Sequence, residues 1–254
     1  MAKKTYTRLA SIFFSKKVIL VCLIALTFWD TLHIFKLKWG VVDLKRREHD
    51  NDQNSIYSLE GGLDIKLSKV SPYTLASIVI AEDVRFYDHI GIDFRALWSS
   101  FKVNFRHGEF LFGGSTITQQ VVKVTLLSPE KTILRKLREI YGALILELIL
   151  TKEEILSWYI NIIYWGQGKY GLVEAADFYF NLTPDLLSIN QSIQLSLILP
   201  APSRLSRVIL RKELGAKQMA KFRSVLFQLR DLGYITEEQL RYSMLTGNFY
   251  SPIK

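Results

Sequence analysis

Hydrophobic and polar positions divide the chain into an apolar run, a polar stretch and a long region of helical periodicity. The apolar run extends from Val18 to Phe35 and has lysines on both sides. It is at the short end of what a bilayer crossing needs, and flanking lysines can extend it by reaching the headgroups. Because no small-residue cleavage pattern follows, we predict a single transmembrane anchor rather than a signal peptide. Residues 1–17 are then a cytoplasmic tail.

Residues 36–70 lack periodicity and are predicted to be a juxtamembrane linker. The segment contains Asp50-Asn51-Asp52, an Asp-x-Asp pattern that some metal-dependent enzymes use. In a solvated linker, we interpret these residues as ordinary polar positions. Five basic residues precede the apolar run and five follow it closely, so basic-residue bias does not orient the anchor.

Residues 71–254 contain many residues that are typical of the starts and ends of helices. Three hydroxyl residues precede a proline and predict helix starts at Ser71-Pro72, Ser128-Pro129 and Thr183-Pro184. Further caps are predicted at Asp93 and at Thr151 with Glu154, and helix ends at Gly108 and Gly233. Alternating strand patterns are scarce, so the domain is predicted to be mainly α.

Two of these helices have strongly apolar faces. After Asp93, one face collects Phe94, Leu97, Trp98, Phe101 and Phe105. After Pro129, the predicted core stripe consists of Ile133, Leu134, Leu137, Ile140, Tyr141, Leu144 and Leu148.

Composition narrows the choice of partners. The net charge is +9 and the pI is about 9.5, which suits nucleic acid, acidic lipid headgroups or a phosphorylated substrate without choosing among them. Cys22 is the single cysteine, so an intramolecular disulfide is excluded.

A polar concentration follows the apolar segment Leu75–Ile80. It runs from Glu82 to Gly91 and holds three carboxylates, an arginine and a histidine. A glutamate beside a core can have a raised pKa, which suits general acid or base chemistry. The alternative is a helix end that turns into solvent.

Two other segments suit an anion. Gly113-Gly114-Ser115-Thr116 precedes a predicted helix start, whose backbone N–H groups favour negative charge; the alternative is a simple loop and cap. Farther on, Lys131, Arg135 and Glu139 lie at i, i+4 and i+8, with Lys136 beside them. They form either a solvated charged face or a clamp for a diphosphate.

Gly166-Gln167-Gly168-Lys169-Tyr170-Gly171 has the G-x-G-x-x-G form of a dinucleotide site. We reject that interpretation because a helix precedes the motif and no acidic residue ends a second strand farther on. A glycine-rich turn between helices is predicted instead.

Together these segments resemble the penicillin-binding-protein glycosyltransferase family, the lysozyme-like peptidoglycan polymerases. The resemblance covers about residues 70 to 205 and follows the family's motif order. The matches are E-D-x-x-F-x-x-H-x-G from Glu82 to Gly91, G-G-S-T-I-T-Q-Q from Gly113 to Gln120, R-K-x-x-E from Arg135 to Glu139, K-x-x-I-L-x-x-Y-x-N from Lys152 to Asn161, and L-P-x-x-P-like Leu199 to Pro202. Departures from the family occur at Asn181-Leu182 and at Asn190 to Ile193.

The resemblance implies roles for individual residues. Glu82 is expected to be the base that deprotonates the acceptor sugar, and Glu139 the carboxylate that supports the diphosphate leaving group. The other expected substrate-binding residues are Asp83, Phe86, His89, Ser115, Thr116, Gln120, Lys123, Lys131, Arg135, Lys136 and Asn161.

The resemblance also implies an activity: polymerisation of lipid II into β-1,4 glycan strands with inversion and release of undecaprenyl diphosphate. A lysozyme-like lytic enzyme is the alternative, and a non-catalytic scaffold is a third hypothesis. The expected fold is a lysozyme-like, two-lobed helical domain in monofunctional form.

The expected location is the outer face of the cytoplasmic membrane, with the N-terminus inside. Lipid II, the growing glycan strand, the membrane and cell-wall synthesis or division proteins are the expected partners, and nucleic acid is not. No metal site or required cofactor is expected, although Mg²⁺ or Mn²⁺ could stimulate the reaction.

Overall fold

The computed structural model describes residues 65–107, 114–126, 132–211 and 214–246. This part of the chain is mainly helical, which confirms the prediction of a mainly α domain, and its strands form one short hairpin. The predicted tail, the anchor from Val18 to Phe35 and most of the linker lie outside the described residues. Within the described ranges, none of the helices combines the length and apolar character that a bilayer crossing requires.

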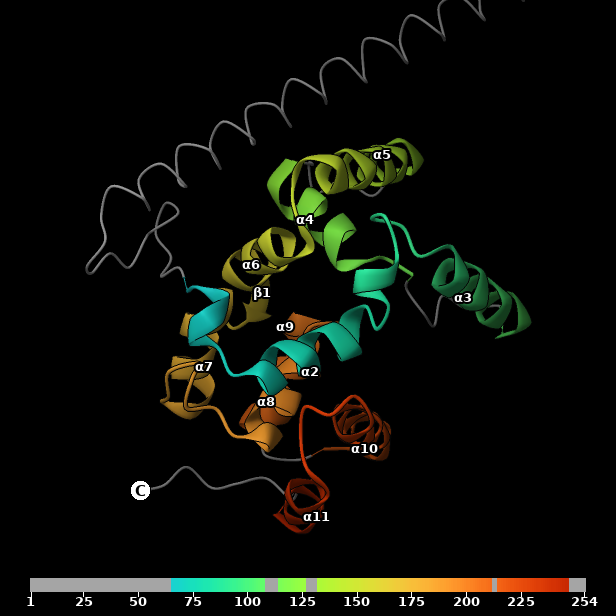
Figure 1. Cartoon of the computed structure of the whole chain (residues 1–254). Coiled ribbons are helices and arrows are strands. Elements are labelled where there is room, and N and C mark those ends of the chain that lie inside the picture. Colours follow the sequence, from blue (N-terminus) through green and yellow to red (C-terminus); the bar gives the residue numbers. More distant parts are fainter. Residues whose placement is uncertain (1–64, 108–113, 127–131, 212–213, 247–254) are drawn as a thin grey trace, which may run out of the picture.

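The α-helices succeed one another with short connections (Figure 1). They are α2 (Pro72–Glu82), α3 (Phe94–His107), α4 (Ile117–Leu126), α5 (Ile133–Ile149), α6 (Lys152–Ile162), α7 (Gly171–Phe180), α8 (Ile189–Ser196), α9 (Pro202–Leu210), α10 (Ala216–Asp231) and α11 (Glu237–Thr246). The short elements are the 3₁₀ turns η1 (Leu67–Lys69) and η2 (Phe86–Asp88) and the strands β1 (Tyr164–Gly166) and β2 (Lys169–Tyr170).

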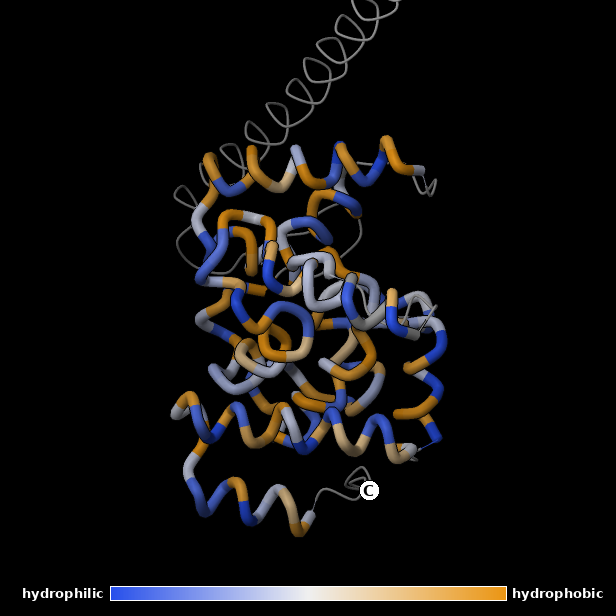
Figure 2. The backbone as a smooth tube through the Cα atoms, turned by 90° about the vertical axis from the view of Figure 1, so that its right-hand side faces the viewer, coloured by the Kyte–Doolittle hydropathy of each residue, from blue (hydrophilic) through white to orange (hydrophobic). Residues whose placement is uncertain are grey.

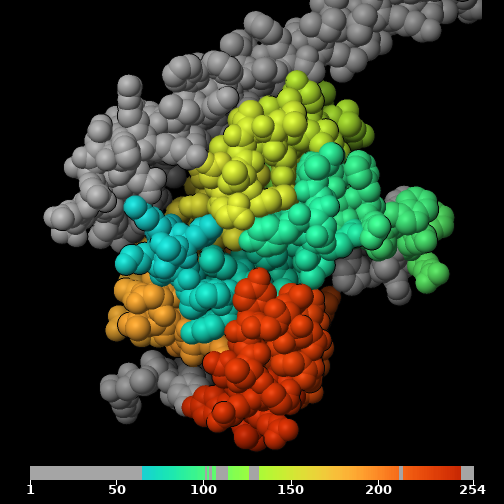
Figure 3. Space-filling model, in the orientation of Figure 1, coloured from blue at the N-terminus to red at the C-terminus, as the bar shows by residue number. Residues whose placement is uncertain are grey.

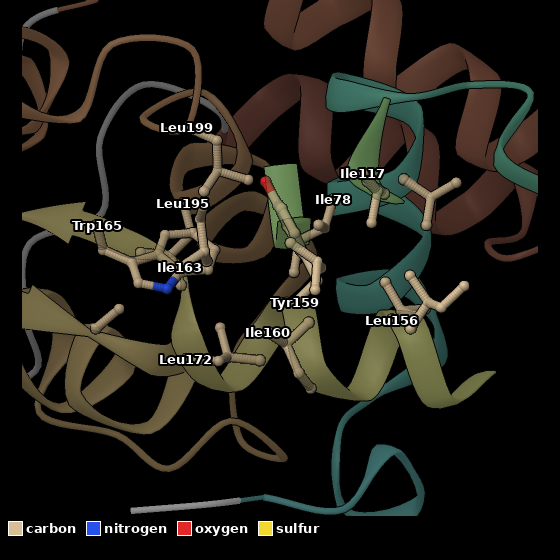
Figure 4. Close-up of a cluster of buried hydrophobic side chains, with 14 of the residues drawn as sticks. Ile78, Ile117, Leu156, Tyr159, Ile160, Ile163, Trp165, Leu172, Leu195 and Leu199 are labelled. Carbon is tan, nitrogen blue, oxygen red and sulfur yellow. The ribbon is translucent and has the colours of Figure 1, made fainter. Parts of the chain in front are cut away.

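Two apolar clusters hold these helices together. The larger joins α2 to α4, α5, α6 and α7, and includes Ile78, Ile117, Leu146, Leu156, Tyr159, Trp165 and Leu172 (Figure 4). The smaller joins α2 to α8, α10 and α11 through Ala76, Ile80, Ile193, Phe222, Leu226 and Leu240. Each fully buried large side chain stabilises the fold by about 1.5–3 kcal/mol. Because α2 belongs to both clusters, its C-terminal end at Glu82 is positioned from two sides.

The space-filling view shows the same division at the surface. On the face in Figure 3, the blue-green surface of the α2 region separates α5 from α10 and α11.

Most predicted helix ends occur where the local chemistry places them. Ser71 stands at the N-cap position of α2 with proline at the first helical position, although its hydroxyl pairs with the Thr74 hydroxyl rather than with the backbone. The Asp93 carboxylate accepts a first-turn N–H of α3. Thr151 and Glu154 form the expected capping box. Gly233 follows α10 with a φ of +78°, the left-handed conformation that ends a helix.

The prediction at Thr183-Pro184 was wrong. Thr183 begins a single turn, closed by the Leu186 N–H, and no helix follows directly. The next helix begins after Ser188, whose capping box with Gln191 satisfies more of the first-turn N–H groups. The site predicted at Ser128-Pro129 lies outside the described residues.

The predicted core stripe of α5 was also wrong. Ile133 and Leu148 are 84% and 81% exposed, and Leu137 is exposed as well. The buried face instead carries Glu139, Gly142, Ala143 and Leu146. In Figure 2, this helix runs along the top of the molecule with hydrophobic and hydrophilic residues alternating along its length. Close packing on α4 requires a small residue, because a Cβ on Gly142 would lie 2.7 Å from a Val122 methyl.

The G-x-G-x-x-G segment lies between α6 and α7, and it forms the β1–β2 hairpin rather than a plain turn. Gly166 packs closely on α9, since a Cβ there would lie 2.7 Å from the Pro202 carbonyl oxygen.

Candidate active site

Glu82 ends α2 and faces α4. The Gln120 side-chain amide donates a hydrogen bond to Glu82 Oε2 at 2.7 Å. Burial raises the pKa of the Glu82 carboxyl, against the lowering effects of the Gln120 hydrogen bond and the Lys221 charge on α10. A carboxyl with a raised pKa is suited to take a proton from a substrate near neutral pH.

Asp83, the next residue, binds the start of α4. Its Oδ2 accepts the Ile117 N–H at 3.0 Å, and His89 Nε2 lies 3.0 Å from both carboxylate oxygens. The Gly91 N–H donates to His89 Nδ1 at 3.1 Å. Since Nδ1 accepts, Nε2 carries a proton and donates it to the Asp83 carboxylate. His89 therefore holds Asp83 in place and is not a free base.

The N-terminus of α4 was predicted to favour an anion. In the structure, the anion at this helix end is the Asp83 carboxylate. Thr116 and Gln119 satisfy further backbone groups as a capping pair, with both hydrogen bonds at 3.1 Å. The start of α4 thus fixes the Asp83 carboxylate. A substrate anion would have to be bound by other hydrogen-bond donors.

Gly91 is the point where this loop contacts α4 and α5. Its carbonyl accepts the Thr116 hydroxyl at 2.7 Å. Its φ is +87°, and a Cβ would lie 2.8 Å from the Ala143 carbonyl oxygen. Both features require glycine.

We therefore expect Gly91→Ala to lower the free energy of unfolding by about 2–4 kcal/mol, from left-handed strain plus a backbone clash. Gly168→Ala is the matched control, because its φ is +74° but nothing lies within 4 Å of the added Cβ. The control should lose only about 1 kcal/mol. Denaturant unfolding of both variants measures the difference, and equal losses would contradict close packing at Gly91.

A second cluster lies on the buried face of α5. Glu139 is 2% exposed and accepts hydrogen bonds from Arg135 at 3.1 Å and from Lys136. Lys136 also donates to the Ser115 hydroxyl at 2.9 Å. Arg135 Nε is buried and has no hydrogen-bond partner among the described residues, so an anionic oxygen there would complete its bonding.

Helix α4 links the two clusters. Ser115, just before its cap, contacts the cations of α5, and Gln120 contacts Glu82. Ser115 lies two residues before α4 begins at Ile117, and Gln120 lies in its first turn. A candidate base and a cation cluster therefore share one rigid support.

Comparison with known proteins identifies the family of the chain. The family model described as Transglycosylase matches residues 53–228. The chain belongs to the Transglycosylase family.

Three relatives illustrate the range of similar proteins. Penicillin-binding protein 1A of Escherichia coli (strain K12) is 32% identical over 206 residues, 80% of this chain and 24% of the relative. The biosynthetic peptidoglycan transglycosylase of Nitrosospira multiformis is 37% identical over 138 residues, 54% of this chain and 60% of the relative.

The third relative, the biosynthetic peptidoglycan transglycosylase of Alcanivorax borkumensis, is 36% identical over 172 residues, 65% of this chain and 70% of the relative. The chain thus spans about a quarter of penicillin-binding protein 1A and about 60% of the Nitrosospira protein.

In this transglycosylase-family chain, the predicted site residues differ in where they lie. Those gathered around the two clusters with some exposure are Glu82, Ser115, Gln120, Arg135 and Lys136. Lys123 is exposed on α4, one turn beyond Gln120. Lys131 lies outside the described residues.

The remaining predicted residues support the site from within. Phe86 is fully buried, with the Lys152 ammonium 4.5 Å from its ring centre. Thr116, Asp83 and His89 are engaged as described above. A direct substrate contact is therefore not available to Phe86.

Asn161 lies apart from the clusters. Its side chain exchanges two hydrogen bonds with the Ile65 backbone, at 2.8 and 3.0 Å, and donates another to the Ser157 carbonyl. Asn161 thus holds the backbone at Ile65 against α6. Since Ile65 and Leu67 also pack on the larger apolar cluster, the packed domain includes the end of the predicted linker.

Two residues of this candidate site were not predicted. Lys221, on α10, interacts electrostatically with Glu82, and no sequence spacing connects positions so far apart. Tyr159 was part of a quoted motif, and its hydroxyl lies 3.4 Å from Gln120 Oε1. Its helix position could have indicated a core residue but not this polar contact.

Proposed function

We propose that this chain is a peptidoglycan glycosyltransferase that polymerises lipid II into β-1,4 glycan strands. The observation that carries the proposal is the shared support, by α4 and the residues just before it, of the half-buried Glu82 and the Arg135–Lys136–Glu139 cluster. The names of the relatives, peptidoglycan transglycosylases and penicillin-binding proteins, point to the same polymer.

The proposed reaction is one displacement. Glu82 takes the proton of the acceptor sugar's 4-hydroxyl, whose oxygen bonds to the donor's anomeric carbon. The bond from that carbon to the diphosphate oxygen breaks, and undecaprenyl diphosphate leaves with the electron pair. Attack from the face opposite the leaving group inverts the anomeric centre. Arg135 and Lys136 stabilise the charge that develops on the diphosphate.

A lytic enzyme remains the alternative function, because it too would use a glutamate in a helical domain of lysozyme-like, two-lobed form. The partly exposed cations Arg135 and Lys136 favour the polymerase, since cleavage of a neutral glycosidic bond releases no diphosphate. Incubation with purified lipid II tests the choice. Long glycan strands on a gel support polymerisation, whereas shortened strands from added peptidoglycan, without new polymer, would show a lytic enzyme.

We further propose that the domain rests against the outer face of the cytoplasmic membrane, behind an N-terminal anchor with its N-terminus inside. Support comes from the exposed apolar residues of α3 and α5, namely Phe94, Leu97, Trp98, Phe105, Ile133, Leu137 and Leu148. Such residues suit contact with lipid, and the lipid-linked substrate is held there. Cell-wall synthesis or division proteins would reach the same face of the membrane.

Replacing Ile133 and Leu148 together with glutamate should weaken this contact. Both are more than 80% exposed, so the unfolding temperature should stay within a few degrees of wild type. Polymerisation in lipid II-containing vesicles should fall several-fold, while the rate in detergent micelles changes little. The matched control replaces Leu232 and Leu245 with glutamate, because both are exposed apolar residues at the α10–α11 end of the fold, and equal losses in both pairs would contradict the proposal.

We propose that no resident metal ion is required. Mg²⁺ or Mn²⁺ fits poorly at Glu139, because two protein cations already occupy that carboxylate. Any stimulation would come from a cation that accompanies the diphosphate. Polymerisation that stops on chelation and returns only with one specific metal would contradict this.

A further inference from the structure

Tyr159 approaches the candidate base without touching it. The residue belongs to α6 and is fully buried; Figure 4 shows its ring standing away from that helix with the oxygen at the far end. The hydroxyl donates to Gln120 Oε1 at 3.4 Å, and the other end of the same carboxamide donates to Glu82 at 2.7 Å. A chain of donors therefore runs from α6 through α4 to α2.

A glutamine carboxamide can satisfy such a chain in two orientations. In the observed one, its N–H faces Glu82, which must then be the acceptor, and an ionised carboxylate accepts this bond more strongly than a neutral carboxyl does. If the carboxamide turns over, its oxygen faces Glu82, which must then hold a proton to donate. The orientation of Gln120 is thus coupled to the protonation of Glu82.

The phenol distinguishes these orientations. In the observed one, its O–H has an acceptor in Gln120 Oε1, and the described residues give it no other hydrogen bond. After a turn of the carboxamide, the Gln120 N–H would face the phenol oxygen, and the phenol O–H would lose its acceptor inside the core. A buried donor without an acceptor is unfavourable. Burial and the charges of Glu82 and Asp83 also raise the pKa of Tyr159 well above its usual value, so it remains a donor.

We propose that Tyr159 is a positioning residue for Glu82: it holds the Gln120 carboxamide in the orientation that donates to the carboxylate. This rests on the proposed role of Glu82 as base. The phenol favours the ionised, proton-accepting form of Glu82 at a site whose burial favours the neutral form. It does so through Gln120, without contact with substrate.

Other charged groups near Glu82 also affect the pKa of its carboxyl. Asp83 follows it in the chain, and Lys221 faces it from α10. Helix α8, which also packs on α2, contains no ionisable residue. None of these groups touches the Tyr159–Gln120 pair through a hydrogen bond, so their contributions should persist when the phenol is removed.

The test is the pH profile of lipid II polymerisation by the full chain with Tyr159→Phe. The acid limb should move to higher pH, with a loss of about three- to tenfold at its acid end and little loss on the alkaline plateau. Tyr73→Phe is the matched control: it removes a phenol that donates to the Leu187 carbonyl at 2.7 Å, near the opposite end of α2 from Glu82. Its acid limb should not move. Thermal unfolding of both variants shows whether either loss reflects folding.

A double substitution separates positioning from packing. With Gln120→Ala already present, Tyr159→Phe should no longer move the acid limb, because the intermediary is gone. A shift that persists there, or an unmoved limb in the single variant, overturns the proposal.

The protonation of Glu82 can also be followed without catalysis, by carbon NMR of glutamate-labelled protein, with Glu82→Gln assigning the signal. A titration that moves with Tyr159→Phe supports the positioning role even if wild type forms no polymer. In that case the proposed function would fail and the inference would stand.

Discussion

Glu82→Gln is expected to leave a folded protein that polymerises lipid II about 10²–10⁴-fold more slowly than wild type. Glutamine keeps the shape of the side chain and a hydrogen bond to Gln120, but it cannot take the acceptor hydroxyl's proton. The loss should appear in kcat more than in KM, because a base acts on the transition state. Gel analysis of labelled glycan strands measures it.

The same substitution should not destabilise the fold. Because burial raises the folded-state pKa of Glu82, its ionised form disfavours folding at every pH above the unfolded-state pKa. Neutral glutamine removes that penalty, so unfolding stability near neutral pH should equal or exceed wild type. Glu153→Gln, at an exposed carboxylate on α6, is the control and should retain activity. A Glu82→Gln enzyme that polymerises at the wild-type rate would refute the assignment of the base.

The helix starts and ends of this fold are local enough to be predicted from the sequence. Asp93, Thr151 with Glu154, and Gly233 act within one helical turn, so the sequence contains the whole interaction. Thr183-Pro184 shows where this fails: hydroxyl and proline fit a helix start, but Ser188 offers a better capping box five residues later.

The faces of helices were harder to predict, because they depend on what surrounds them. On α5, the apolar stripe points outward and Glu139 inward, opposite to the rule for a helix of a water-soluble domain. The rule assumes water outside. An outer apolar face with an inner cation cluster is what a helix between a lipid surface and a diphosphate site would show.

Within the site, the motifs indicated which residues to consider, but they did not show which of them the protein's own groups engage. Phe86, His89 and Asn161 follow the expected spacing, yet each is engaged with protein groups. Lys221 is separated from Glu82 by 139 positions (221 − 82), and only the packing of α10 on α2 brings the two charges within range of each other. Long-range contacts of this kind can be identified only from the folded structure.

The second large effect is expected at Glu139. Glu139→Gln removes the charge that Arg135 and Lys136 share, and the glutamine can accept from only one of them while its own N–H groups face the other. Two neighbouring cations then lack a counter-ion. Breaking a buried pair costs about 3–5 kcal/mol, but the two cations are 17% and 37% exposed and can be partly hydrated. We therefore expect a loss of about 2 kcal/mol, measured by denaturant unfolding.

Glu237→Gln is the matched control for this loss. Glu237 also contacts two arginines, Arg230 at 2.9 Å and Arg241 at 3.5 Å, but its side chain is 54% exposed. Surface pairs of this kind contribute about 0–1 kcal/mol, so the control should unfold nearly as wild type does. Equal losses in the two variants would show that burial of the Glu139 carboxylate is not the reason for its contribution to unfolding stability.

Catalysis by Glu139→Gln should separate two roles of the cluster. Without the carboxylate, Arg135 and Lys136 are free to bind anions, so inorganic pyrophosphate should inhibit polymerisation more strongly than in wild type. Turnover should nevertheless fall, by about 10²-fold, because the cations are no longer held where the leaving group's charge develops. If pyrophosphate inhibits less strongly than in wild type, the cluster does not bind diphosphate, and the leaving-group site must lie elsewhere. Tighter pyrophosphate binding with slower turnover would instead show that Glu139 limits ground-state binding of the diphosphate while keeping its two cations in place for the transition state.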